Sequence, residues 1–352
     1  MPRRSRRSPS IDNREVLTFE QAIGMLGGDT RPHVLLGNGF SRACRDDIFA
    51  YDALFDRADF AALSPHARSA FEALATTDFE VVMRSLRQAA ILVELYEANE
   101  TPLAVQLAVD ADGLREVLVS AIAGSHPARP GDIDNEAYEA CKLFLAHFHR
   151  IYTVNYDLLL YWALMQSEIE PQVACDDGFR KPDDDSASYV TWEPENSYQQ
   201  NVYYLHGALH IFDAGFEIQK YTWINTGVPL IDQIRDALQN NLYPLFVSEG
   251  DSDKKLERIR HSDFLSKAHR SFLNIGGALF TYGLSFAIND AHIFRLILKS
   301  KVRQLFLAIF SDPNEPSNRE IIDRAEALVG QRPQTRPLTV HVYDASTAHV
   351  WG

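Results

Sequence analysis

The sequence contains few cysteines. Cys44, Cys141 and Cys175 are the only three in 352 residues, and no two of them form a CxxC pair. A zinc site with four cysteine ligands is therefore excluded by number alone. The same scarcity argues against a disulfide framework and predicts reduced thiols, which are typical of cytoplasmic proteins.

Long apolar runs are also missing. No segment approaches the roughly 18 consecutive apolar residues that cross a bilayer, and the N-terminal segment has no secretory apolar region. We therefore expect a cytoplasmic protein that has no contact with a membrane.

Positive charge is in deficit. The chain has 34 lysines and arginines against 48 aspartates and glutamates, which is a formal net charge of −14. The opening MPRRSRRSPS holds four of the arginines and no acid. The remaining chain should repel nucleic acid, because its average charge is strongly negative. Residues 1–15 are expected to be a disordered basic tail, the one part that could contact nucleic acid.

Short β-branched or aliphatic runs alternate with helical segments. The runs lie at 33–37, 151–155, 201–206, 243–247, 277–282, 304–310 and 338–343. Most of them are continuously apolar, which is typical of strands buried on both faces of a mostly parallel sheet. Crossover helices are expected at 157–168, 252–274, 289–300 and 316–329. The predicted fold class is α/β with a Rossmann-like sheet.

Two stretches interrupt this order. Residues 45–150 are helical in pattern and too long for a simple crossover, so they predict a helical subdomain inserted after the first βα unit. The Rossmann-like domain then comprises 16–44 and 151–352. The insertion is expected to cover the cleft or to form oligomer contacts, and added core is the alternative. Residues 175–200 are polar, acidic and rich in turn residues, which predicts a surface loop.

The first polar motif is GNGFS, which follows the first strand. It comprises Gly37, Asn38, Gly39, Phe40 and Ser41. Gly37 permits a tight turn, Gly39 allows a pyrophosphate to approach the backbone, and Ser41 can cap the helix and donate to phosphate. The full GxGxxG pattern is absent, because an arginine stands at the third glycine position. A tight turn without a nucleotide explains the motif equally well.

The second motif, TVNYD, follows the second strand. Thr153, Asn155 and Asp157 are its polar residues. The alternative to a ligand site makes Asp157 the cap of the next helix and Asn155 a turn residue.

Two further strands end in small or polar residues. His206 and Gly207 end the third strand, where a histidine can act as a base near pH 7 and the glycine leaves room for a substrate. His210 follows, but two histidines without a third ligand are a poor case for a metal, and we expect none. A later strand ends in YGLS, followed by polar residues that could equally be helix caps. These candidates are Gly283, Ser285, Asn289 and Asp290.

The carboxyl ends of parallel strands meet at one edge of a sheet, so the four motifs should converge on one crevice. In this order they resemble the sirtuin fold, in the divergent bacterial branch that consumes NAD and does not deacylate proteins. The resemblance covers residues 33 to 310, roughly. Longer stretches, among them GNGFSRACRDDIFAYDALF and ASTAHVWG, are also similar to an uncharacterised bacterial family placed beside the sirtuins. A related abortive-infection family begins with GNGFD, which implies a phage-defence setting by analogy.

The resemblance implies a role for each motif. Asn155 would orient the ribose hydroxyls or the attacking water, His206 would be the general base, and Asp157 would fix this network or stabilise a cationic ribose. The pyrophosphate would contact Gly37, Gly39 and Ser41, and the adenosine side would contact Gly283 and Ser285. Two features depart from sirtuin deacylases. This chain cannot build their four-cysteine zinc ribbon, and Asn38 replaces the alanine of their GAG motif.

We therefore expect an NAD hydrolase that cleaves the nicotinamide–ribose bond to give nicotinamide and ADP-ribose. NAD is its substrate and no metal is expected. A homo-oligomer or a separate ATPase partner would restrain such an enzyme, and the chain itself has no P-loop. The alternative is a sensor that binds NAD, ADP-ribose or a related nucleotide without cleaving it. A hydride-transferring oxidoreductase and a nuclease fit the motifs and the charge less well.

Overall fold

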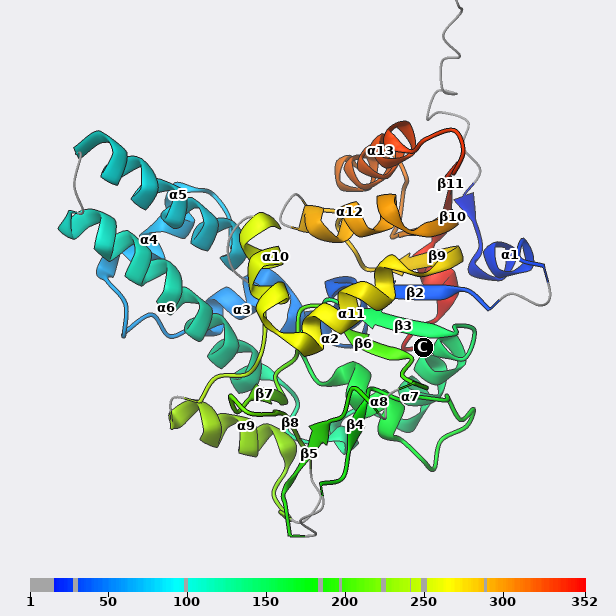
Figure 1. Cartoon of the computed structure of the whole chain (residues 1–352), viewed down its shortest axis with the longest axis horizontal. Coiled ribbons are helices and arrows are strands. Elements are labelled where there is room, and N and C mark those ends of the chain that lie inside the picture. Colours follow the sequence, from blue (N-terminus) through cyan, green and yellow to red (C-terminus); the bar gives the residue numbers. More distant parts are fainter. Residues whose placement is uncertain are drawn as a thin grey trace, which may run out of the picture.

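The protein folds around one central sheet (Figure 1). The computed structural model describes residues 16–27, 31–97, 101–182, 186–195, 198–222, 226–240, 242–247, 252–287 and 290–352. The expected basic tail at 1–15 and the candidate Asn289 lie outside the described residues. The sheet has seven strands, and each strand is parallel to its neighbours. This arrangement confirms the predicted α/β, Rossmann-like fold class.

The strand order is β1-β11-β10-β9-β2-β3-β6. In this order the strands are Val16–Leu17, Thr339–Asp344, Lys301–Ile309, Gly276–Tyr282, His33–Leu36, Arg150–Thr153 and Val202–Tyr204. Six of the seven predicted strands are confirmed here. The strand predicted at 243–247 is wrong, because this segment instead bonds to the turn after β6, with the Val247 amide donating to the His206 carbonyl at 2.8 Å.

Each face of the sheet has its own helices, because successive strand residues point to opposite sides. Val34 and Leu36 belong to the same apolar cluster as residues of α1 (Phe19–Gly24), α2 (Asn38–Phe49), α7 (Asn135–Leu145) and α8 (Leu159–Met165). Leu35 belongs to a second cluster, with residues of α11 (Asp263–Leu273), α12 (Ala291–Lys299) and α13 (Pro316–Gln331). Both faces are thus covered, which explains the continuously apolar strand sequences.

The chain order reverses at β2. From this strand the chain proceeds to β3 and β6 on one side, and later returns through β9, β10 and β11 on the other side. In open α/β sheets ligands bind at such a reversal, in the crevice outside the carboxyl ends of the strands. The topology therefore places a candidate site between the turns that follow β2 and β9.

In the described part of the predicted insertion, four helices lie between α2 and α7. They are α3 (Tyr51–Arg57), α4 (Pro65–Ala73), α5 (Phe79–Glu97) and α6 (Pro102–Ser125). The α5–α6 hairpin projects away from the sheet (Figure 1), while Leu114, Leu118 and Ile122 at the inner end of α6 join the first apolar cluster. The predicted range 45–150 also contains α7, but this helix packs on the sheet through Phe144. The ring centroids of Phe144 and Tyr282, in β9, are 5.5 Å apart.

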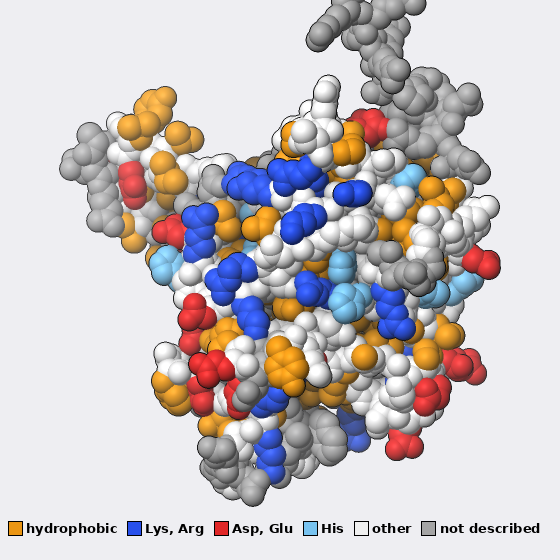
Figure 2. Space-filling view, turned by 45° about the vertical axis from the view of Figure 1, so that its right-hand side comes forward, with side chains coloured by type: hydrophobic (Ala, Val, Ile, Leu, Met, Phe, Trp, Pro, Cys, Tyr) orange, Lys and Arg blue, Asp and Glu red, His pale blue; other side chains and the backbone are white. Residues whose placement is uncertain are grey.

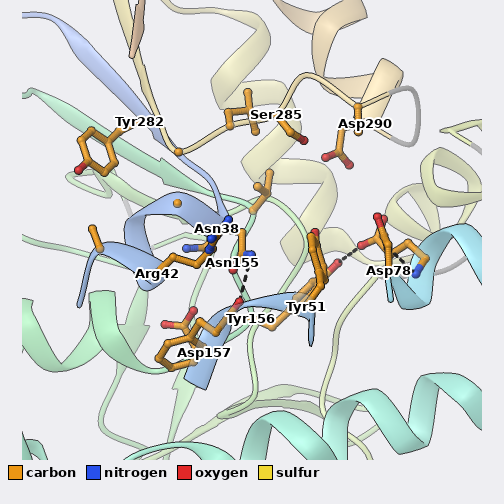
Figure 3. A pocket seen from close by; sticks show the side chains of 18 of the residues that line it. Asn38, Arg42, Tyr51, Asp78, Asn155, Tyr156, Asp157, Tyr282, Ser285 and Asp290 are labelled. Atoms are coloured by element: carbon orange, nitrogen blue, oxygen red, sulfur yellow. Dashed lines mark hydrogen bonds between the residues drawn. The ribbon is translucent and has the colours of Figure 1, made fainter. Parts of the chain in front are cut away.

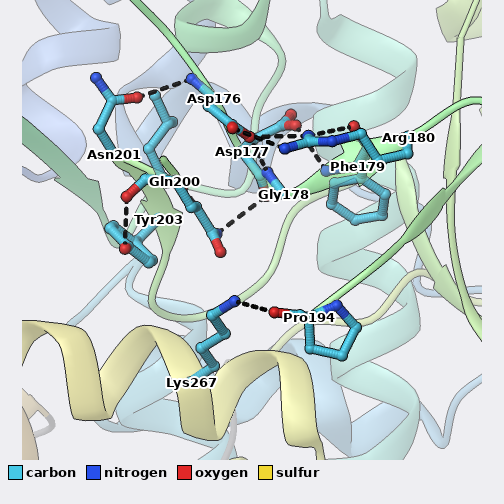
Figure 4. A network of polar contacts seen from close by, with 11 residues as sticks. Asp176, Asp177, Gly178, Phe179, Arg180, Pro194, Gln200, Asn201, Tyr203 and Lys267 are labelled. Atoms are coloured by element: carbon cyan, nitrogen blue, oxygen red, sulfur yellow. Dashed lines mark hydrogen bonds and ion pairs between the residues drawn. The ribbon is translucent and has the colours of Figure 1, made fainter. Parts of the chain in front are cut away.

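The surface loop predicted at 175–200 contains part of a second sheet. This sheet is antiparallel, with the order β4-β5-β8-β7. In this order the strands are Phe179–Arg180, Tyr189–Trp192, Ile218–Tyr221 and Ile211–Asp213. Figure 4 shows why acidic residues occur here: Asp176 accepts from the Gly178 amide and pairs with Arg180, both at 2.8 Å. Asp176 therefore holds the turn into β4.

The helix predicted at 252–274 is divided in two. The α10 helix (Ser252–His261) ends before Ser262, and the Ser262 hydroxyl accepts from the Leu265 amide at 3.4 Å to begin α11. The helix α9 (Leu230–Gln239) precedes this pair. Short 3₁₀ turns occur at Pro130–Asp132 and Ala345–Ala348.

The surface charge is unevenly distributed. Figure 2 shows lysine and arginine side chains gathered on one face, over α10, α11 and α12. The exposed lysines and arginines of these helices include Arg258, Arg260, Arg270, Arg295 and Lys299. This face is a local exception to the net negative charge. Among the described residues, no helix is long and apolar enough to cross a membrane.

Candidate functional site

A cavity of about 760 Å³ lies at the carboxyl edge of the central sheet (Figure 3). Its floor comes from the turns after β2, β3, β6 and β9, where the strand order reverses. Its opposite wall comes from the insertion, through Tyr51, Asp78, Phe79, Glu80, Leu118 and Ile122. Residues of the insertion therefore form one wall of this cavity.

The predicted site residues fall into three groups. The cavity is lined by Asn38, Gly39, Asn155, Asp157, His206, Gly283, Ser285 and Asp290. Gly37, Phe40, Ser41, Thr153 and Gly207 do not line it but lie directly behind or beside those that do. Asn289 is outside the described residues. The structure thus brings the four sequence motifs together around one cavity.

The glycines of GNGFS allow two backbone turns to touch. The Gly37 amide donates to the Tyr282 carbonyl and the Gly39 amide to the Gly283 carbonyl, both at 2.9 Å. A Cβ atom on Gly39 would lie 2.4 Å from the Gly283 Cα. The close approach predicted for a pyrophosphate is therefore made by the turn after β9. This corrects the predicted role of both amides, since neither is left to donate to phosphate.

Ser41, Asp157 and Asn155 form a buried network beneath the cavity. The Ser41 hydroxyl donates to Asp157 Oδ2 at 2.5 Å, and Asn155 Nδ2 donates to Ser41 Oγ at 2.8 Å and to the Gly37 carbonyl at 3.0 Å. Ser41 therefore holds the network and does not donate to phosphate, which corrects its predicted role. No described residue hydrogen-bonds Oδ1 of Asn155, which leaves this oxygen as an acceptor for a ligand.

The carboxyl group of Asp157 is buried. Burial raises its pKa, while the hydrogen bonds from the Ser41 hydroxyl and the Leu159 amide oppose that rise. The Leu159 amide donates to Asp157 Oδ1 at 2.9 Å, which closes a turn just before α8. The N-cap of α8 is Leu158, so Asp157 is not the cap that was weighed as the alternative to a ligand site, and it lines the cavity.

The remaining residues of the first two motifs support their turns. Asn38 Nδ2 donates to the Phe49 carbonyl at 3.2 Å, across the length of α2. The buried Phe40 ring packs on Trp351, whose Nε1 donates to the Phe40 carbonyl at 2.9 Å. Thr153 Oγ1 accepts from the Asn155 amide at 3.0 Å. These contacts hold the turns in place. Of Asn38, Phe40 and Thr153, only Asn38 also lines the cavity.

A histidine that the sequence did not single out supports the same turn from behind. His126 Nε2 accepts from the Leu158 amide at 3.1 Å, while Nδ1 lies 3.0 Å from the Pro127 carbonyl. The carbonyl can only accept, so Nδ1 carries the proton and the ring is neutral. Burial lowers the pKa of His126 to about 4.

This neutral ring should make stability depend on pH. In the unfolded chain His126 titrates near 6.5, so between pH 6.5 and about 4 the unfolded state binds the extra proton. Its contribution is complete above pH 6.5 and is lost as the pH falls, by up to about 3 kcal/mol. His126→Gln keeps an acceptor for Leu158 and cannot titrate. Urea unfolding at pH 7.5 and 5.0 should show a smaller loss in the variant, and equal losses would contradict this assignment.

His206 lies at the end of β6 with its side chain only 2% exposed. Its Nε2 is 2.9 Å from Nε2 of His292 and 3.8 Å from Oδ1 of Asp290. Burial lowers the pKa of His206 well below its usual value, and the nearby positive charge of Lys255 acts in the same direction. The imidazole is therefore neutral at pH 7, and Nε2 faces a second histidine.

Gly207 allows the chain to turn beside His206. Its φ is +80°, and a Cβ atom would lie 1.9 Å from the Leu245 carbonyl oxygen. The room it provides is filled by the 243–247 segment and not by a substrate. His210 is buried between the rings of Tyr161 and Tyr204, whose centroids lie 4.6 and 5.6 Å from the centroid of its imidazole. It does not line the cavity.

The far end of the cavity is acidic, and the buried ammonium group of Lys255 lies behind it. Lys255 Nζ lies 2.7 Å from Glu80 Oε2 and 3.3 Å from Asp290 Oδ1. Burial would lower the pKa of Lys255, but the two carboxylates outweigh burial and raise it. Burial raises the pKa of Glu80, against the effect of Lys255. The Tyr156 hydroxyl donates to Glu80 Oε1 at 3.1 Å.

Sequence reasoning missed Glu80 and Lys255. They are 175 positions apart, each lies in an ordinary helical pattern, and only the fold brings them together. His292 follows Asp290 by two positions, and no spacing in the sequence indicates that it contacts His206. Arg42 is the arginine that stands at the third glycine position of the GxGxxG pattern, and no role was predicted for it. It is the only lysine or arginine among the described residues that line the cavity.

The family model described as a domain of unknown function (DUF4917) matches residues 34–351. The chain belongs to the DUF4917 family. No curated protein matches the sequence.

The DUF4917 match runs from β2 to Trp351. Every residue that lines the cavity lies within it, including those of the α3–α6 insertion. The insertion is therefore part of the DUF4917 domain.

Proposed function

We propose that this protein cleaves the nicotinamide–ribose bond of NAD with water. The observation that carries the proposal is the cavity at the reversal point of the parallel sheet, with Asn155, Asp157 and His206 on its floor. Its volume lies within the range of about 300–1,000 Å³ that is usual for small-molecule sites. The sirtuin-like order of motifs supports a dinucleotide as the occupant.

The charges around the cavity suit the two ends of NAD. Figure 3 shows Asn38 and Arg42 on one side of the cavity, and Asp78 and Asp290 on the other. Arg42 would contact the pyrophosphate, in place of the backbone amides that the structure shows to be occupied. The acidic side would receive the cationic nicotinamide riboside, whose charge carboxylates stabilise.

The reaction requires little acid–base help. As the C1′–nitrogen bond breaks, positive charge develops on the ribose, as in glycoside hydrolysis, and nicotinamide leaves as a neutral molecule. Water adds to C1′ and one proton is released, giving ADP-ribose and nicotinamide. Oδ1 of Asn155 would accept from a ribose hydroxyl or from the water. Asp157 would hold Asn155 through Ser41, and His206 would take the proton.

A nucleotide sensor is the second candidate, and the position of His206 favours it. Its Nε2 faces His292, and burial lowers its pKa, so it is a weak base in this arrangement. In a sensor the same cavity would bind NAD, ADP-ribose or a related nucleotide, and Asn155 would be a ligand contact only.

Incubation of the purified chain with NAD distinguishes the two. The hydrolase releases nicotinamide and ADP-ribose in equal amounts, which chromatography measures directly. Saturable binding of NAD or ADP-ribose without product would favour the sensor, and neither binding nor release would contradict both. A parallel incubation with reduced NAD in place of NAD is the control. Its neutral dihydronicotinamide is a poor leaving group, so reduced NAD should remain intact.

The setting of the activity follows from the same proposal. An NAD hydrolase that is always active would drain its own cell, so we expect it to be restrained until triggered. A homo-oligomer, a separate ATPase partner, a cytoplasmic location and a role in anti-phage defence stay predictions from the sequence and its resemblance.

A further inference from the structure

Three side chains from two parts of the chain converge beside the cavity. They are His206 at the end of β6, Asp290 at the start of α12 and His292 within it. One nitrogen or oxygen from each lies within 4.8 Å of the other two. His206 and Asp290 also line the cavity, so the group is open to a ligand there.

We propose that His206, Asp290 and His292 bind one divalent first-row transition-metal ion. Two imidazoles and a carboxylate on one side of an ion are a common ligand set for such metals. This inference goes beyond the proposed function and can be tested without NAD. It also replaces the expectation from the sequence that no metal is bound, which rested on pairing His206 with His210.

The spacing fits an ion with ligands at right angles. Two atoms that each lie about 2.1 Å from a metal are about 3 Å apart at a right angle and about 3.4 Å apart at a tetrahedral angle. The two Nε2 atoms are 2.9 Å apart. Asp290 Oδ1, at 3.8 Å from His206 Nε2, needs to approach by less than about 1 Å. Octahedral coordination would leave positions open toward the cavity.

Two carboxyl groups and one ammonium lie beside the proposed site. Glu80 and Asp290 both face Lys255. Lys255 shares Oδ1 of Asp290 with the proposed ion, but its shorter contact is to Glu80, at 2.7 Å. It can therefore release Asp290 and keep a partner.

A bound ion would change the role of His206 in the proposed hydrolysis. An imidazole nitrogen that holds a cation cannot accept a proton. The group that activates water would then be the ion, whose bound water is more acidic than free water. The deep burial of His206 suits a ligand that binds metal as the neutral imidazole.

Metal content and Co²⁺ binding test the proposal. The full chain, purified without a polyhistidine tag, is stripped with a chelator and titrated with Co²⁺ and with Zn²⁺. We expect one ion per chain by elemental analysis, with visible Co²⁺ absorption bands. His292→Ala and Asp290→Asn should each weaken Co²⁺ binding by about a hundredfold or more, since loss of an outer-sphere partner alone costs 10–100-fold.

His261→Ala is the matched control. His261 is an exposed histidine in α10, outside the cluster, and its loss should leave Co²⁺ binding unchanged. Wild-type protein that binds neither ion, or a folded Asp290→Asn variant that binds Co²⁺ like the wild type, would overturn the proposal. Metal binding without NAD binding or cleavage would support this site and count against the proposed function, while NAD cleavage by metal-free protein would support the hydrolase and show that the ion is not needed for it.

Discussion

Nicotinamide release is expected to fall by about 10²–10⁴-fold when Asn155 or His206 is replaced by alanine. A single positioned base contributes about this factor, and one polar group aimed at developing charge contributes about 10²–10³-fold. Asn155→Ala removes Oδ1, the acceptor that no described residue occupies, together with the two bonds that Nδ2 donates. Product formation at matched concentrations of folded protein measures the effect.

Asn201→Ala is the control for this loss. Asn201 also makes two side-chain hydrogen bonds, to the Asp176 amide and the Ala174 carbonyl, each at 2.7 Å, and it is remote from the cavity. Its replacement should lower stability by about as much as Asn155→Ala and leave turnover unchanged. If Asn155→Ala and His206→Ala both hydrolyse NAD like the wild type, the assigned site is wrong.

Gly283→Ala should destabilise the fold by about 2–6 kcal/mol. Gly283 has a φ of +67°, and a Cβ atom would lie 2.4 Å from the Gly39 Cα and 2.5 Å from the Phe40 amide nitrogen. A strained residue costs about 1–3 kcal/mol and an overpacked contact about the same again. Because both contacts are backbone, neither turn can yield without opening the floor of the cavity. Urea unfolding measures the change in the free energy of unfolding.

Gly330→Ala separates this effect from the general cost of changing a glycine. Gly330 lies in α13, and nothing surrounds the position of an added Cβ within 4 Å. Alanine should stabilise the helix there by about 0.5–1 kcal/mol. A Gly283→Ala variant as stable as the wild type would show that the two turns do not touch as described.

The sheet was predictable because its strands carry their own signal. A strand buried on both faces must be apolar at consecutive positions, so runs such as VLL before Gly37 are visible without a partner. The glycine turns that follow were visible because each stands directly after such an apolar run. The short strands β4 and β5 were not, because their stability comes from pairing within a small antiparallel sheet and from the Asp176 turn.

The candidate site was predictable only in part. The motifs around Asn155 and His206 were found because each stands at the end of an apolar run. Their interpretation changed because the amides of Gly37 and Gly39 bind another turn, which no local pattern encodes. The basic face over α10 to α12 was likewise hidden, because an average charge says nothing about where charges gather.

The sequence by itself determined which segments are strands of a parallel sheet and which residues stand at their carboxyl ends, because these are consequences of local periodicity. Only the tertiary structure decided which distant residues meet. Lys255 pairs with Glu80, and His206 meets His292, because an insertion and a late helix pack against the same sheet edge. Such contacts depend on how whole elements pack, so the chemistry of the cavity is a property of the fold.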